Sequence, residues 1–204
     1  MIKTYAIVAT QLSFTALLTA GIYSSESAKE FVRDNFYLHY VALILGVALM
    51  CTLVCCVKQA RKVPRNYILL GLFTVCWAYM VAGVTQWYEP EDVFMATVFT
   101  AAMVIGLTIF ACFCNMKLTW LWGIAAAGSI AVFPLIIFFW IFPSKLLFII
   151  ICFFVIILTS IYIIWDTKMI MTKLDLDEYI IGALMLYVDI VQLFMWLLSL
   201  LGNS

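Results

Sequence analysis

The residues that could do chemistry are two aspartates, Asp166 and Asp189, which lie inside the last two apolar stretches of the chain. An ionised carboxylate near the centre of a bilayer costs roughly 2.5–3.5 kcal/mol on insertion scales, so such a group usually faces a partner or a water path. Because the two stretches follow one another, we expect them to form antiparallel neighbouring helices. The sequence therefore predicts that both aspartates face a shared site.

Helix geometry allows the two carboxyl groups to meet. At about 1.5 Å of rise per residue, their depths in the membrane differ by roughly one to two turns. Helices about 8–10 Å apart can bring such groups within reach, directly or through a water. In a low-dielectric site the pair is expected to hold one proton near neutral pH, which makes it a proton switch. Its candidate counter-charge is the basic group Arg61, Lys62 and Arg65.

A structural interpretation of the two aspartates is also open. Asp166 lies near the end of its apolar stretch, where a carboxylate can reach the interface or satisfy the helix end. Asp189 can make a hydrogen bond that only holds helices together, as polar side chains in membranes often do.

The elements that position the aspartates are apolar helices. Of the 204 residues, 67% are hydrophobic and 11% are charged. Soluble domains average about 25% charged residues, so the chain belongs in lipid. A spanning helix needs about 20 apolar residues, and seven such stretches are predicted at residues 4–25, 37–57, 66–86, 92–113, 118–142, 145–171 and 178–201. We expect an all-α membrane protein with a single seven-helix domain over residues 1–204.

The charged residues between these stretches predict an orientation. Eight of the eleven basic residues fall on the side of the N-terminus, and three fall on the other side. The positive-inside rule therefore places the N-terminus in the cytosol, or in the matrix for a mitochondrial inner-membrane protein. Before the last helix, Asp175 and Glu178 have the spacing of a capping box, in which both side chains satisfy free backbone N–H groups.

Other kinds of site have little support in the sequence. The seven cysteines lack the C-x-x-C spacing of metal and redox sites, and the single histidine, His39, is expected at the membrane interface. A net charge of zero argues against nucleic acid as a partner, and no phosphate-binding loop or catalytic triad occurs. The sequence therefore predicts neither an enzyme nor a cofactor.

Embedded small and polar residues predict how the helices pack. Polar side chains such as Gln11 are expected to hydrogen-bond between helices. Glycines inside the apolar stretches are expected to let neighbouring helices approach closely; these are Gly71, Gly83, Gly106, Gly123, Gly128 and Gly182.

Several segments resemble the Bax-inhibitor/lifeguard (TMBIM) family. Trp165–Lys168 resembles the Asp-Thr-Gln element of the family, and Asp177–Leu184 resembles its Glu-Glu-Tyr-Ile-x-Gly-Ala-Leu motif. Leu186–Val191 is similar to the Tyr-Leu-Asp-Ile motif that follows. Upstream, Lys3–Leu12 resembles the opening of the family, and Arg61–Leu70 resembles its basic loop and third helix. The resemblance therefore covers almost the whole chain.

The resemblance implies a fold, an activity and a site. The fold would have seven helices with the last one surrounded by the other six, and the activity would be a calcium leak across an intracellular or bacterial membrane. Asp166 and Asp189 match the paired aspartates of the family, which sense protons, lie on the ion path and would contact Ca²⁺ transiently. The basic residue that latches this pair in some members falls at Arg61. The family is also linked to suppression of cell death and to calcium release from endoplasmic reticulum, Golgi or mitochondria.

Two functions of different classes follow from the sequence. The first is a pH-gated cation leak channel selective for calcium, whose partners are the lipid bilayer, Ca²⁺ and protons. Carboxylate oxygens suit a hard cation of this kind. The second is a non-transporting accessory subunit of a larger membrane complex, for example in the mitochondrial inner membrane. The acidic outer face and the apolar exterior are compatible with contacts to other membrane-protein subunits.

Overall fold

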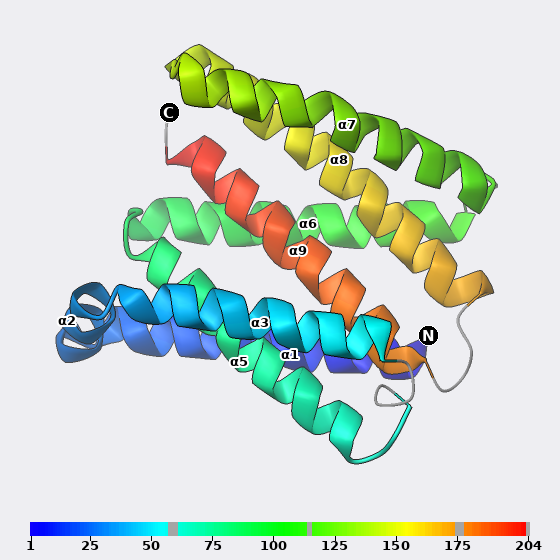
Figure 1. The fold of residues 1–204 in the computed structure, drawn as a ribbon, viewed down its shortest axis with the longest axis horizontal. Helices are drawn as coiled ribbons and strands as arrows, with labels where there is room; N and C mark the ends of the chain where they lie inside the picture. Colours follow the sequence, from blue (N-terminus) through cyan, green and yellow to red (C-terminus); the bar gives the residue numbers. More distant parts are fainter. Residues whose placement is uncertain (57–60, 114–115, 174–177, 203–204) are drawn as a thin grey trace. The chain divides into compact units, whose positions relative to one another are not determined.

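The seven predicted spans are present as seven long helices. A computed structural model describes residues 1–56, 61–113, 116–173 and 178–202, which are helical and contain no strand. The long helices are α1 (Ile2–Ser24), α3 (Tyr37–Cys55), α5 (Arg65–Thr85), α6 (Pro90–Phe113), α7 (Leu118–Ile141), α8 (Lys145–Thr172) and α9 (Tyr179–Leu201), as Figure 1 shows. Each is long and apolar enough to cross a membrane. The predicted fold class is therefore confirmed, with helix ends that differ by a few residues at most.

A short helix, α2 (Glu26–Asp34), was not predicted from the sequence. The Ser25 side chain accepts a hydrogen bond from the backbone N–H of Ala28, which satisfies a free donor of the first turn. Lys29 pairs with Glu26 at 2.9 Å, and Val32 is the buried residue of the helix. A search for long apolar stretches cannot find this helix, because its nine residues are mostly polar and its apolar face is narrow.

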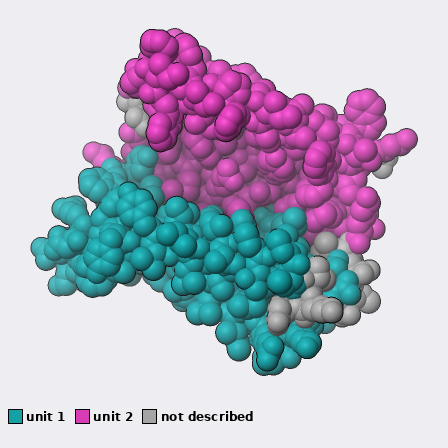
Figure 2. All heavy atoms as spheres, in the orientation of Figure 1, with its two compact units in different colours: residues 1–88, 174–187 teal, residues 89–173, 188–204 magenta. Residues whose placement is uncertain are grey.

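The backbone divides into two compact units, which Figure 2 colours separately. Unit 1 consists of residues 1–88 and 174–187, and in it α5 packs against both α1 and α3. Unit 2 consists of residues 89–173 and 188–204, and in it α8 packs against both α6 and α7. Helix α9 contributes its first half to unit 1 and its second half to unit 2. The single domain and the central position of the last helix stay predictions.

Buried hydrogen bonds between polar side chains link the helices of unit 1. The Nε2 of Gln11 in α1 donates to the hydroxyl of Thr74 in α5 at 2.8 Å, which confirms the role predicted for Gln11. The hydroxyl of Thr15 shares a hydrogen bond of 2.8 Å with the hydroxyl of Tyr187 in α9. Lipid offers these groups no hydrogen bonds, so the pairs favour association of the helices that carry them.

Glycines allow close helix packing at only some of the predicted positions. A Cβ added at Gly83 would overlap His39, and one added at Gly128 would come within 2.8 Å of the Leu158 side chain. A Cβ at Gly71, Gly106 or Gly123 would meet no described atom within 4 Å, so the prediction is wrong for these three. Sequence cannot separate the two groups, since a glycine that faces lipid and one that faces a helix occur in equally apolar stretches.

Candidate functional site

Asp166 belongs to the buried face of α8. The buried residues of this helix recur every three or four positions, which is the period of one helix face. The stripe consists of Cys152, Val155, Ile156, Thr159, Ile163, Asp166, Thr167 and Ile170. Asp166 retains only 4% exposure, so its carboxyl group points into protein and not toward lipid.

The structure brings Asp166 and Asp189 together inside unit 2. Asp189 lies in the part of α9 that belongs to this unit, and its carboxyl group lies within hydrogen-bonding range of that of Asp166. An ionised carboxylate can only accept hydrogen bonds. Two carboxyl groups at this range can therefore hydrogen-bond to one another only when at least one of them holds a proton.

Two carboxylates are too few to form a resident calcium site. Calcium takes about six to eight oxygen ligands, including water and backbone carbonyls. Within residues 1–56, 61–113, 116–173 and 178–202, no group of three or more His, Cys, Asp or Glu side chains could hold a metal ion. A cation at the pair would keep water among its ligands.

Arg61 and Glu178 form an ion pair in unit 1. The Nη2 of Arg61 lies 2.7 Å from Oε1 of Glu178, the residue that directly precedes α9. The backbone carbonyl of Glu178 accepts a hydrogen bond from the N–H of Gly182 at 3.2 Å, as expected at a helix start. Asp175 lies outside the described residues, so the capping box stays a prediction. The predicted role of Arg61, which is to hold the aspartate pair in place as a latch, also remains a prediction.

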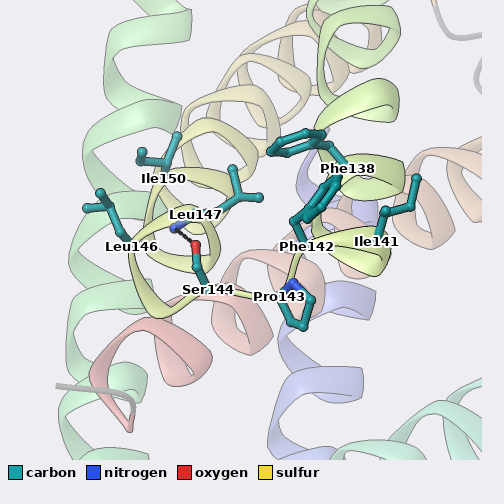
Figure 3. A pocket seen from close by; sticks show the side chains of 8 residues that line it. All are labelled: Phe138, Ile141, Phe142, Pro143, Ser144, Leu146, Leu147 and Ile150. Atoms are coloured by element: carbon teal, nitrogen blue, oxygen red, sulfur yellow. Dashed lines mark hydrogen bonds between the residues drawn. The ribbon is translucent and has the colours of Figure 1, made fainter.

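A surface groove of about 480 Å³ lies at the turn between α7 and α8 and is shown in Figure 3. The groove is lined by Phe138, Ile141, Phe142, Pro143, Ser144, Leu146, Leu147 and Ile150. Its one side-chain hydroxyl, on Ser144, accepts a hydrogen bond from the N–H of Leu147 at 3.2 Å, at the start of α8. The lining is otherwise apolar and suits contact with hydrocarbon better than binding of an ion.

Two interhelical contacts of unit 1 were missed in the sequence. Tyr187, which bonds Thr15, occurs only two residues before Asp189 but carries no sign of a partner 172 positions away. His39 lies in the first turn of α3, and the structure buries it against α5 at 9% exposure, a contact that was not predicted. The signal for this burial is a glycine, Gly83, on the facing helix, and it can be interpreted only when the register of the two helices is known.

Comparisons with known proteins agree with the fold. A family model described as "Inhibitor of apoptosis-promoting Bax1" matches residues 1–204. Human Protein lifeguard 3 is 28% identical over 98% of this chain and 67% of its own length. Among plant relatives, Protein LIFEGUARD 1 of Arabidopsis thaliana is 32% identical over 98% of this chain and 87% of its own length. Protein LIFEGUARD 2 of the same plant is 30% identical over 98% and 85%.

These matches confirm the resemblance seen in the sequence motifs. The family model covers the whole chain, and the seven long apolar helices are those expected of a multi-pass membrane protein. The chain therefore belongs to the Bax inhibitor family, which includes the lifeguard proteins.

Proposed function

We propose that this protein is a pH-sensitive leak channel for Ca²⁺, gated by the carboxyl pair of Asp166 and Asp189. The observation that carries the proposal is the close approach of two carboxyl groups on membrane-spanning helices. The two groups can hydrogen-bond to one another only while the pair holds a proton. The charge of the pair, and with it the contact between α8 and α9, therefore depends on pH.

The repulsion between two ionised carboxylates is strong enough to drive opening and closing of a channel. Two unit charges about 4 Å apart repel one another by about 4 kcal/mol at an effective dielectric constant of about 20. Since about 1.4 kcal/mol corresponds to a tenfold change in an equilibrium, loss of the last proton can shift two helix arrangements by roughly a thousandfold. A Ca²⁺ ion that passes the ionised pair would offset this repulsion, because carboxylate oxygens are preferred calcium ligands.

The cellular role follows from the family. The matching family is described as an inhibitor of an apoptosis-promoting protein, and we extend that role to this chain as suppression of cell death through calcium homeostasis. The protein would act in endoplasmic reticulum, Golgi or the mitochondrial inner membrane, with its N-terminus on the cytosolic or matrix side. Tagging each terminus and testing its protease protection in isolated organelles checks both the compartment and the orientation.

Calcium flux into liposomes tests the channel. Purified protein is reconstituted with a calcium dye inside the vesicles, and flux is followed across about pH 6 to 8, a range that a carboxyl pair sharing one proton can reach. We expect pH-dependent flux in the wild type and loss of that dependence in Asp166→Asn and in Asp189→Asn. Glu30→Gln is the matched control, because it also neutralises one carboxylate but is exposed on the short helix α2, outside the candidate spans.

A different outcome would favour the accessory-subunit function. In that case folded protein gives no more flux than empty liposomes at any pH. The observation in favour of this alternative is that the spans of α6 and α7 are each only 11% buried, which leaves large apolar faces for lipid or for other subunits. A stable complex isolated in mild detergent, together with absent flux, would support it.

A further inference from the structure

The side chain of His39 packs inside unit 1 against a glycine, Gly83, on the facing helix. A Cβ added at Gly83 of α5 would lie 1.7 Å from Nε2 of His39, so the imidazole ring occupies the space that any larger residue would need. The ring centre lies 4.9 Å from that of Tyr79 and 5.2 Å from that of Phe36. These contacts hold the ring near the start of α3 and the end of α5, where it is 9% exposed.

Three buried polar atoms at this end of unit 1 have no hydrogen-bond partner in the described part of the chain. They are Nδ1 of His39, the hydroxyl oxygen of Tyr79 and Nε2 of Gln86. Tyr79, Gly83 and Gln86 follow one another at intervals of four and three residues, so they share the face of α5 that receives His39. The residues that carry the unpartnered atoms therefore lie on the two helix surfaces that meet at His39.

Leaving these atoms unpaired is costly. Each buried polar atom without a hydrogen bond costs about 1–3 kcal/mol, and lipid cannot supply the missing partner. Water can supply it, because a buried water typically makes about three hydrogen bonds to polar atoms that are otherwise unsatisfied. The amide Nε2 of Gln86 can donate to a water, while the Tyr79 hydroxyl and the imidazole of His39 can each donate or accept.

A further unpartnered polar atom lies elsewhere in unit 1. The Oε1 of Gln11 is also buried and unpartnered among the described residues, although its Nε2 bonds Thr74. Thr74 and Gln86 are twelve positions apart on or next to α5, which corresponds to about 18 Å of helix. Unsatisfied polar atoms thus occur both near the end of α5 and beside its middle.

We propose that unit 1 contains an internal water-binding site formed by His39, Tyr79 and Gln86. The site lies on different helices from Asp166 and Asp189 and does not depend on the function proposed for that pair. It places water between α3 and the end of α5. Gly83 is essential to this site because it admits the imidazole ring.

The single histidine of the chain makes the test unambiguous. Protein labelled with ¹⁵N-histidine in lipid bilayers gives one imidazole, and solid-state NMR can measure transfer of magnetisation from water to its nitrogens. We expect clear transfer in the wild type and in Gly71→Ala, a matched change on α5 that meets no described atom within 4 Å. We expect loss of transfer in Tyr79→Phe/Gln86→Leu, which removes two of the three polar groups.

Two results would overturn the proposal. The first is a well-resolved imidazole signal that receives no magnetisation from water, with Nδ1 bonded directly to a side chain such as Tyr79. The second is transfer that is unchanged in the double variant, since the water would then not be bound by these groups. Tyr79→Phe alone serves as the milder variant if the double variant does not fold, and it should reduce the transfer. Calcium flux is not part of this readout, so the two proposals can fail separately.

Discussion

Replacing Gly83 by alanine should destabilise the protein by forcing His39 out of its position. The added Cβ would lie 1.7 Å from Nε2 of His39 and within 2.8 Å of two further ring atoms, so the rigid ring must rotate away from Phe36 and Tyr79. Overpacking of this kind typically costs about 1–3 kcal/mol. Alanine offsets up to about 1 kcal/mol of this through its higher helix propensity.

A second glycine of the same helix separates these two effects. Gly71 is exposed and a Cβ there meets no described atom within 4 Å, so Gly71→Ala should be neutral or stabilising by up to about 1 kcal/mol. The free energy of unfolding of Gly83→Ala should therefore lie about 1–3 kcal/mol below that of Gly71→Ala. Unfolding in mixed micelles with increasing denaturing detergent, followed by circular dichroism, measures this difference.

A double-mutant cycle tests whether the overlap with His39 causes the loss of stability in Gly83→Ala. In the His39→Ala background the ring is absent, so adding Gly83→Ala should cost much less than it does in the wild type. Equal stability of Gly83→Ala and Gly71→Ala would refute the reasoning. So would an unchanged cost of Gly83→Ala in the His39→Ala background, because the overlap would then involve something other than the imidazole.

Two further predictions concern pairs of side chains in unit 1. Thr15→Val and Tyr187→Phe should each lower the free energy of unfolding by about 1–2 kcal/mol, because each breaks a buried hydrogen bond of 2.8 Å. The double variant should lose less than the sum of the two, and strict additivity in the same unfolding assay would contradict a direct bond. Arg61→Ala and Glu178→Ala should each cost less than about 1 kcal/mol, since the two side chains are 45% and 23% exposed. Detergent unfolding that shows a much larger loss would mean that Arg61 supports more than this ion pair.

The sequence was sufficient to predict the spanning helices. In lipid every backbone N–H and C=O must be bonded within its own segment, so a long apolar stretch has essentially one structure available to it. For this reason α1, α3 and α5 through α9 begin and end close to the predicted residues. The family motifs could also be recognised, because they are local in the chain and are concentrated around Asp166, Tyr179 and Asp189.

Contacts between helices required the tertiary structure. The sequence allowed Asp166 and Asp189 to meet but left a purely structural role open, since helix rotation decides whether two side chains at similar depth face one another. Rotation and register also decided that Gly83 receives His39 while Gly71 faces outward, and that Arg61 bonds Glu178. An apolar stretch determines its own backbone, whereas the partner of a side chain depends on packing between segments far apart in the chain. Hydrophobicity alone specifies this packing weakly, because lipid and a neighbouring helix are about equally apolar.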